Sequence, residues 1–448
     1  MNTQRAASSR TNGLAAALAD RLVRGVYTVF TWGALPGVLA YFFWRGRREP
    51  AYRQHWRERL GQVRGVPTGA IWVHAASVGE AVLVTPLIQR LQRDHPACPV
   101  LVTTMTPTGR AHIERVFADT VYCRYIPLDT RGATRRFMRA TRPRLAVIAE
   151  TELWPNLLSA ARRYAVPVAL VNASISARSA SRYRFALWRA TIADMLGSLA
   201  AIGAASQAHA QRFIALGARA DRTHAIGNLK YDTVAAGADD VGARKLRDAW
   251  QAGQRPIWVA ASTHEGEEVR VLNAWARLRE RFPSLLLVIA PRHPQRFEAV
   301  AELLRTRGHG FARRSSQQPV TPDTEIVLAD TLGEVPLFYA AADVALVGGS
   351  LVPGIEGHNV LEAAARACPL CVGPYIREWR EIVDALAAAG AARICDTPAQ
   401  LVATLDAWLA TPAQARAAGE AGRRLVRERA GALDRTVKIL ESFAGNLS

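Results

Sequence analysis

Two acidic motifs that directly follow short apolar runs contain residues able to act as a general base. In the first, Ser77-Val-Gly-Glu80, the glycine weakens a helical turn and allows a ligand to approach closely. In the second, Glu150 and Glu152 stand two residues apart and share one face if the strand continues. A carboxylate at the mouth of a cleft can deprotonate an attacking hydroxyl group. The alternatives are structural: a capping box for Ser77 and Glu80, and acids that favour a helix N-terminus for the second motif.

Basic and glycine-containing motifs in the second half are typical of a site for a phosphorylated ligand. Arg292 could stack on a nucleotide or donate hydrogen bonds to it, and helix N-termini that carry glycine bind anions. Glu362 stands in an expected helix, where an acid could bind a ribose. Each motif is weak alone, but together they predict a nucleotide site. The motifs are Ala290–His293, Thr331–Glu334, Gly348–Ser350 and Gly357–Glu362.

Lys230 is a further candidate for binding an anionic ligand. It lies in the segment Gly227-Asn-Leu-Lys-Tyr-Asp, where the second half of the chain is expected to begin. A cation there could meet a carboxylate or phosphate of the ligand. An ordinary solvated lysine is the simpler explanation.

The sequence lacks the motifs of several other nucleotide and metal sites. It has no D-x-D, which argues against a transferase that holds Mn²⁺ or Mg²⁺ with paired aspartates, and no P-loop, H-E-x-x-H or early G-x-G-x-x-G. Cys368 and Cys371 form a C-x-x-C, but no second pair stands at zinc spacing, and the segment is typical of a short buried strand. The five cysteines form no even disulfide framework, which favours a reducing compartment.

Short apolar runs alternate with helical stretches from Ile71 onward, and the pattern restarts after Gly227. This alternation predicts doubly wound parallel sheets, which bind ligands at the carboxyl ends of their strands. We therefore expect two α/β domains, residues 49–227 and 228–448, whose ligand-binding ends face one cleft. The expected strands are Ile71–Ala75, Val100–Thr104, Leu145–Ala149, Val168–Asn172, Pro256–Ala261, Leu285–Ala290, Val344–Val347 and Pro369–Gly373.

The N-terminal segment is typical of a membrane anchor. Gly25 to Trp44 contains no charged residue and is long enough to cross a bilayer. Three arginines follow within four residues, which favours a cytoplasmic location for the rest of the chain. Pro36 could kink the segment, so shallow insertion into one leaflet is an alternative, as is a buried core helix. We expect residues 1–48 to form the anchor and its basic flank.

Composition indicates a globular protein with an anionic partner. The chain has 448 residues, enough for two domains, and half of them are hydrophobic. The net charge of +19 favours nucleic acid, acidic lipid or a phosphorylated substrate without choosing among them. A surface that reflects an arginine-rich proteome is the alternative.

The motifs taken together resemble one known family. From the N-terminal apolar segment past Gly373, the chain resembles bacterial transferases of 3-deoxy-D-manno-octulosonic acid (Kdo). The family usually has proline where this chain has Val360. The motifs that carry the resemblance are HAASVGE, TTMTPTG, ETELWPN, GNLKYD, STHEGEE, APRHPQRF, DTLGE, and VGGSL followed by GHNVLEAAA.

The resemblance implies a fold and an activity. The fold is GT-B, in which two Rossmann-like domains face a central cleft. The activity is inverting, metal-independent transfer of Kdo from CMP-Kdo to a lipid A precursor (lipid IVA), on the cytoplasmic side of the bacterial inner membrane. CMP-Kdo is then a co-substrate, no other cofactor or metal is expected, and the anionic partners are lipid and donor rather than nucleic acid.

The resemblance also implies roles for individual residues. Glu80 corresponds to the catalytic base, and Glu150 and Lys230 correspond to residues that stabilise the transition state. The residues that correspond to CMP contacts are Pro291, Arg292, Leu332, Gly333, Glu334, Asn359, Val360, Leu361 and Glu362.

Two competing hypotheses use the same motifs. The first is a different enzyme on this fold, either another nucleotide-sugar transferase or a sugar epimerase, although an epimerase has no need of an apolar anchor. The second is a membrane-bound nucleotide-binding protein without activity, which has no need of a base such as Glu80.

Overall fold

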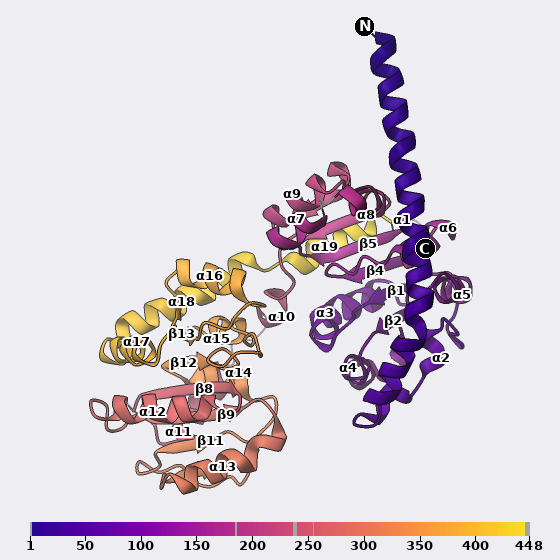
Figure 1. Ribbon diagram of the computed structural model, residues 1–448. Helices are drawn as coiled ribbons and strands as arrows, with labels where there is room; N and C mark the ends of the chain where they lie inside the picture. Colours follow the sequence, from indigo (N-terminus) through magenta and orange to yellow (C-terminus); the bar gives the residue numbers. More distant parts are fainter. Residues whose placement is uncertain (1, 184–185, 236–239, 254, 444–448) are drawn as a thin grey trace. The chain divides into compact units, whose positions relative to one another are not determined.

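A computed structural model describes residues 2–183, 186–235, 240–253 and 255–443 (Figure 1). The chain divides into two compact units. The first unit comprises Met1–Thr233 together with Ala430–Ser448, and the second comprises Val234–Arg429. Each unit is built on its own parallel sheet with helices on both sides.

The first unit contains a sheet whose described strands run in the order β3-β2-β1-β4-β5-β6-β7, all parallel. Apolar side chains alternate between its two faces: Trp72 packs in one core cluster, and its neighbours Ile71 and Val73 pack in the other. Burial on both faces explains why these strands are continuous apolar runs. The strands are β1 (Ile71–His74), β2 (Val100–Thr104), β3 (Tyr122–Tyr125), β4 (Leu145–Ala149), β5 (Val168–Ala173), β6 (Ala201–Ala204) and β7 (Thr223–Ala225).

Helices cover both faces of this sheet and, in the case of α1, extend beyond it (Figure 1). Side-chain caps begin several of them: Thr106, Thr130 and Ser206 each accept a hydrogen bond from a backbone N–H of the first turn. The helices are α1 (Asn2–Arg45), α2 (Trp56–Arg59), α3 (Val78–Asp94), α4 (Pro107–Phe117), α5 (Arg131–Thr141), α6 (Pro155–Arg163), α7 (Ala177–Tyr183), α8 (Ala186–Gly197), α9 (Gln207–Ala215) and α19 (Ala432–Glu441), with α10 (Asp232–Ala235) at the unit boundary.

The second unit repeats the design with the strand order β10-β11-β9-β8-β12-β13-β14, again parallel. Its strands are β8 (Ile257–Thr263), β9 (Leu286–Pro291), β10 (Phe311–Arg313), β11 (Ile326–Leu328), β12 (Val344–Val347), β13 (Leu370–Val372) and β14 (Ala392–Ile394). Its helices are α11 (Asp240–Ala249), α12 (Glu267–Arg279), α13 (Phe297–Thr306), α14 (Val335–Ala341), α15 (Leu361–Ala365), α16 (Arg380–Ala388), α17 (Pro398–Ala410) and α18 (Pro412–Arg429).

The two doubly wound sheets confirm the fold class expected from the alternating pattern. The expected strands all form, with ends that match or differ by at most two residues. Cys368 and Cys371 are buried thiols in and beside β13, as the interpretation of a short buried strand requires. In each sheet the strand order reverses at one point, between β1 and β4 and between β8 and β12. Ligands of such sheets bind outside the carboxyl ends of the strands at that point.

The ends of the second unit differ from the expected domain of residues 228–448. The C-terminal helix α19 packs on the first unit, where Val437 and Leu440 join the core cluster beside α3. The segment before Thr233 also belongs to the first unit, because the Asp232 carboxylate accepts hydrogen bonds from the backbone N–H groups of Gly431 and Leu433. Those hydrogen bonds hold the two crossing segments together. Sequence periodicity marks elements but not the partner on which a terminal helix packs.

From Leu22 to Arg45, helix α1 lies against the first unit along one face. Arg24 pairs with Asp194 of α8, and the Tyr27 hydroxyl donates to Asp129, which directly precedes the N-cap of α5. Its opposite face is apolar and exposed. The exposed large side chains on α1 are Leu22, Val26, Val29, Phe30, Trp32, Tyr41, Phe43 and Trp44. Within the described residues, Leu22–Arg45 is a helical stretch long and apolar enough to cross a membrane.

Candidate active site

Glu80 is held rigidly where β1 turns into α3. Ser77 is the N-cap of α3 and accepts a hydrogen bond from the backbone N–H of Glu80. The Glu80 carboxylate accepts two more, from the backbone N–H of Ala76 at 2.9 Å and from the Ser77 hydroxyl at 3.0 Å. The capping box predicted as the structural alternative therefore forms, except that the Glu80 carboxylate accepts the backbone N–H of Ala76 rather than that of the N-cap residue Ser77. It fixes the carboxylate at the switch point of the first sheet, so capping and catalysis are compatible roles.

The electrostatic environment of Glu80 suits a general base. The pKa of Glu80 is raised to about 7, chiefly by burial and also by the nearby carboxylates of Glu150 and Glu152, against the lowering effect of the hydrogen bonds from Ala76 and Ser77. A carboxyl group with a pKa near the working pH is ionised often enough to accept a proton and basic enough to hold it. The two acidic motifs of the sequence therefore meet in space.

Glu150 occupies an unusual backbone position at the end of β4. Its φ of +56° lies in the left-handed region, which a residue with a side chain rarely adopts. The strained residue is held by a 2.8 Å hydrogen bond from its backbone N–H to the carbonyl of Val171 in β5. Strain of this kind persists where the surrounding structure enforces it, commonly at functional sites. Glu152, two residues later, instead accepts a hydrogen bond from the indole of Trp154.

Lys230 belongs to the same edge of the first sheet. The backbone N–H of its neighbour Leu229 donates to the side chain of Asn172, which also has a positive φ, of +54°, at the end of β5. Leu229 packs against Leu83, one turn along α3 from Glu80. The structure thus gathers Glu80, Glu150 and the Lys230 segment at the carboxyl ends of β1, β4 and β5. The expected boundary at residue 228 had placed Lys230 in the other domain.

Arg292 and Pro291 lie at the carboxyl end of β9 in the second unit. The backbone N–H of Arg292 donates to the carbonyl of Thr263 at the end of the adjacent strand β8. Its side chain is exposed at this edge of the sheet. The guanidinium is therefore free to contact a ligand while its backbone is fixed by the sheet.

The loop with Leu332, Gly333 and Glu334 is fixed by two arginines from the segment after α13. Arg314 donates to both carboxylate oxygens of Glu334, at 2.6 and 3.2 Å, and this contact holds the pKa of Glu334 below its ordinary value. Gly333 has a φ of +82°, and the Leu332 side chain is exposed. The loop is therefore held at its end while its tip stays open to a ligand.

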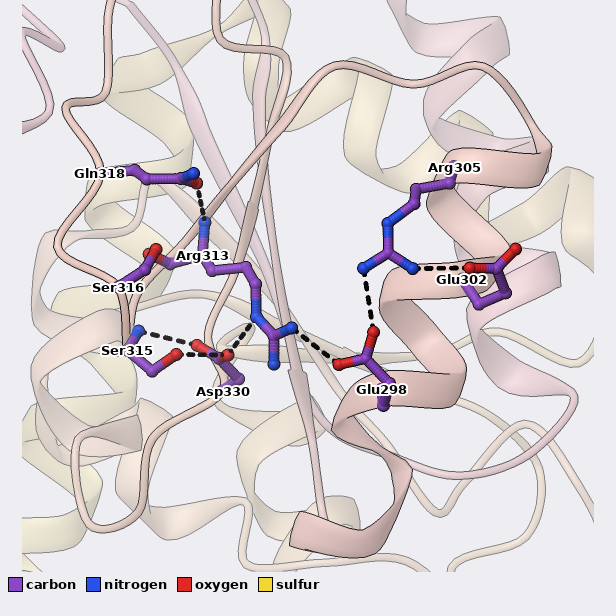
Figure 2. Close-up of polar contacts among 8 residues, drawn as sticks. All are labelled: Glu298, Glu302, Arg305, Arg313, Ser315, Ser316, Gln318 and Asp330. Atoms are coloured by element: carbon purple, nitrogen blue, oxygen red, sulfur yellow. Dashed lines mark hydrogen bonds and ion pairs between the residues drawn. The ribbon is translucent and has the colours of Figure 1, made fainter.

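The start of the same loop is anchored by a buried carboxylate (Figure 2). Asp330 accepts hydrogen bonds from the Arg313 guanidinium at 2.7 Å and from the backbone N–H and hydroxyl of Ser315. Arg313 also reaches Glu298 of α13. Sequence reasoning assigned no role to Arg313 or Arg314, because neither lies in a motif and only the fold brings them to the loop.

Asn359 and Glu362 form a small polar unit at the start of α15. The Asn359 amide donates to Glu362 at 3.1 Å, and the Asn359 carbonyl oxygen accepts from the backbone N–H of Leu361. Burial raises the pKa of Glu362, while Asn359 and Arg292 lower it, so Glu362 lies within the electrostatic reach of Arg292. The side chains of Val360 and Leu361 are buried. A ligand can therefore meet these two residues through their backbone only.

A buried acid that sequence reasoning missed shapes the glycine-rich turn after β12. The Glu267 carboxylate accepts hydrogen bonds from the backbone N–H groups of Gly349, Ser350 and Leu351, and from that of His264. The acid is fully buried. It ties the N-terminus of α12 to the turn, and so fixes the switch point of the second sheet.

Comparison with known proteins identifies the family. A family model described as 3-deoxy-D-manno-octulosonic-acid transferase matches residues 54–233. The 3-deoxy-D-manno-octulosonic acid transferase of Haemophilus influenzae is 36% identical over 427 residues, covering 94% of this chain and 98% of that protein. The transferase of Bordetella pertussis is 38% identical over 440 residues, covering 94% of this chain and all of that protein. The chain belongs to the Kdo transferase family.

Membership of the Kdo transferase family makes this protein a glycosyltransferase and excludes the non-catalytic hypothesis. The solved structure of UDP-GlcNAc 2-epimerase from Neisseria meningitidis, bound to UDP-GlcNAc, has a TM-score of 0.55 and covers 83% of this chain and all of that one. It is 15% identical, so it shows the shared GT-B fold alone. The identity to Kdo transferases over 94% of the chain favours the transferase over the epimerase hypothesis.

Proposed function

We propose that this Kdo transferase moves Kdo from CMP-Kdo to a lipid A precursor, lipid IVA, with inversion at the anomeric carbon and without a metal ion. The observation that carries the proposal is the Glu80 carboxylate, fixed at the switch point of the first sheet with a pKa near 7. An inverting transfer in one step needs one such base. The resemblance of the motifs to those of the family supports the identity of the donor and the acceptor.

In the proposed reaction Glu80 accepts the proton of a hydroxyl group of the acceptor. The oxygen of that hydroxyl group attacks the anomeric carbon of Kdo at the same time. The bond from that carbon to the phosphate oxygen breaks, and CMP leaves with the bonding electrons. Lys230 and Arg292 supply positive charge for the developing anions.

The absence of a D-x-D motif supports transfer without a metal. Turnover that persists in EDTA agrees with this step, and turnover restored by Mg²⁺ or Mn²⁺ contradicts it.

The decisive assay supplies purified protein with CMP-Kdo and lipid IVA in detergent. We expect Kdo to appear on the acceptor and CMP to be released in equal amounts. UDP-sugars serve as the control donors, and no turnover is expected with them. Transfer from a UDP-sugar with none from CMP-Kdo contradicts the proposed donor.

Removing Arg292 or Glu362 should weaken donor binding specifically. A charge-assisted hydrogen bond contributes about 1.5–3 kcal/mol, so Arg292→Ala and Glu362→Ala should each raise the Kd for CMP by roughly 10- to 100-fold. Isothermal titration calorimetry with CMP measures this. Arg281→Ala, which breaks an exposed ion pair with Asp406, is the matched control and should leave the Kd unchanged. Unchanged affinity in both site variants contradicts a nucleotide site in the second unit.

We propose further that α1 lies in the cytoplasmic leaflet of the inner membrane rather than crossing it. Between Leu22 and Trp44, one face of the helix is occupied by contacts with the first unit, such as those of Arg24 and Tyr27, and the other face is apolar and exposed. A helix that keeps a protein domain along this stretch cannot be surrounded there by lipid on all sides. Shallow insertion buries the outer face and keeps the inner contacts. It also brings the active site near a lipid acceptor.

Polar substitutions on the outer face of α1 should release the protein from membranes. Fully burying one large apolar side chain stabilises by about 1.5–3 kcal/mol, so Val29→Gln with Phe30→Gln should lower the partition into anionic vesicles at least tenfold, a change of about 1.4 kcal/mol. Vesicle co-sedimentation measures the partition. Val241→Gln, at an exposed valine of the second unit, is the control. An unchanged partition of the double variant would place the membrane contact elsewhere.

A further inference from the structure

Three histidines meet at the carboxyl ends of the central strands of the second sheet. His264 follows β8, His293 follows β9, and His358 lies in the loop after β12. The Nε2 atoms of His264 and His358 are 2.7 Å apart, and the two rings are nearly coplanar, at 11°. The ring of His293 meets that of His264 edge-on, at 85° with centroids 5.2 Å apart. None of the three had a role in the sequence analysis.

The short distance between the Nε2 atoms of His264 and His358 shows that the two rings share a hydrogen bond. A separation of 2.7 Å is shorter than the roughly 3.5 Å of an unbonded contact, so the two nitrogens share a hydrogen bond. A neutral imidazole carries one N–H, and therefore one ring donates and the other accepts. One further proton converts the pair to imidazolium and imidazole, joined by a stronger, charge-assisted hydrogen bond. The pair can thus take up one proton without losing its geometry.

Backbone contacts keep the two rings in place. The backbone N–H of His264 donates to Glu267 at the start of α12. His358 lies over Gly349, where an added Cβ would come within 2.7 Å of its ring, so only glycine leaves room for it. The Gly357 N–H donates to the Gly349 carbonyl and closes the loop that carries His358. The pair is therefore a preformed feature of the sheet edge.

The charges around the pair favour an anion. Arg292, Arg296 and His293 face the pair and lower the pKa of His264, together with burial, which is the larger cause. The acids nearby are already engaged: Glu268 pairs with Arg296, and Glu267 accepts four backbone N–H groups. Glu362 is bound by Asn359. Arg296 is thus paired with a carboxylate, whereas the Arg292 side chain is exposed, so Arg292 is the cation placed to meet an anion at this edge.

We propose that His264 and His358, with His293 beside them, form a proton-linked binding site for the phosphate group of the donor. The inference rests on the proposed function, which places the donor in this unit. Without a ligand, burial and the nearby cations keep the pair neutral, and they lower the pKa of His358 to about 4. A bound anion offsets those cations and raises the pKa of the pair, so that one proton enters with the ligand.

The test is calorimetry of the full-length protein with CMP in two buffers of different ionisation enthalpy. At pH 7.0 the CMP phosphate, whose second pKa is about 6, is mostly a dianion, so a proton taken up on binding goes either to the protein or to the phosphate, and the histidine variant described below distinguishes the two. We expect an uptake of about half a proton or more per CMP, and a Kd that rises roughly twofold or more from pH 7 to pH 8. No uptake by the unaltered protein overturns the inference.

A double variant assigns the proton to the histidine pair. Glutamine can replace the Nε2 hydrogen bond but does not titrate, so His264→Gln with His358→Gln should still fold, bind CMP more weakly, and take up no proton. His309→Gln, at a histidine that packs against Trp275, is the control and should keep the full uptake. Uptake retained by the double variant, or lost in the control, overturns the assignment. If the unaltered protein binds no CMP, the proposed function fails and this inference fails with it.

Discussion

Replacing Glu80 with glutamine should lower kcat by about 10² to 10⁴ while the fold and the affinity for CMP stay unchanged, because general-base catalysis contributes that much to a rate. Glutamine is the sharper test than alanine. Its carbonyl oxygen can accept the N–H of Ala76 and its amide can donate to the Ser77 hydroxyl, so the start of α3 keeps its cap. The substitution therefore removes the base and little else.

Single-turnover kinetics with CMP-Kdo and lipid IVA measure the effect, and circular dichroism and CMP calorimetry check the fold and the donor site. Glu114→Gln, at an acid of α4 that pairs with Arg110, is a matched control in the same unit and should keep normal turnover. Normal turnover by folded Glu80→Gln would leave Glu80 with its capping role alone.

The pH dependence of the reaction follows from the same residue. With a pKa of about 7, Glu80 is mostly protonated below pH 6 and mostly ionised above pH 8. The rate should therefore rise about tenfold per pH unit below pH 7 and level off above it. Glu80→Gln should lose this limb of the profile. A pH profile that Glu80→Gln leaves unaltered would contradict the assignment of the limb to Glu80.

The raised pKa of Glu80 also affects stability, with a defined sign. Its folded-state pKa of about 7 lies above the ordinary value of 4.5, so the folded state binds the proton more tightly than the unfolded state does. Its contribution to stability is present below pH 4.5 and is lost as the pH rises through 7. Because glutamine does not titrate, the Glu80→Gln variant should not lose this contribution to stability. Its melting temperature should fall less between pH 5 and pH 8 than that of the unaltered protein.

Replacing Glu267 with alanine should destabilise the second unit by about 3 kcal/mol or more. Three buried backbone N–H groups and the half-buried one of His264 lose their acceptor, and each buried donor left without a partner costs about 1–3 kcal/mol. The glycine-rich turn after β12 should open, and CMP binding should weaken with it. Urea unfolding followed by tryptophan fluorescence measures stability, and hydrogen exchange at Gly349 to Leu351 measures opening of the turn.

Glu265→Ala is the matched control for that substitution. Glu265 lies two residues earlier and is exposed, so its removal should change stability by less than about 0.5 kcal/mol. Equal stability of the Glu267→Ala and Glu265→Ala variants would show that the turn after β12 holds its shape without the buried carboxylate.

Local signals explain how much of this protein the sequence determined. Strands buried on both faces must be continuous apolar runs, so Ile71 and its neighbours mark β1 without any tertiary information. Ser77 with Glu80 marks the start of α3 in the same way, because a cap is made within four residues. The motifs at the ends of such strands indicated the edge of each sheet where the candidate residues lie.

Contacts between distant segments decided the rest. The pKa of Glu80 depends on burial and on the charge of Glu150, seventy residues away, and no local pattern encodes either. The return of α19 to the first unit placed the Lys230 segment beside Glu80 and Glu150 rather than with the second sheet. The pairing of His264 with His358 joins loops ninety-four residues apart. Sequence spacing specifies what a short segment can form, whereas side chains from different segments acquire their chemistry only when the sheet brings the ends of its strands together.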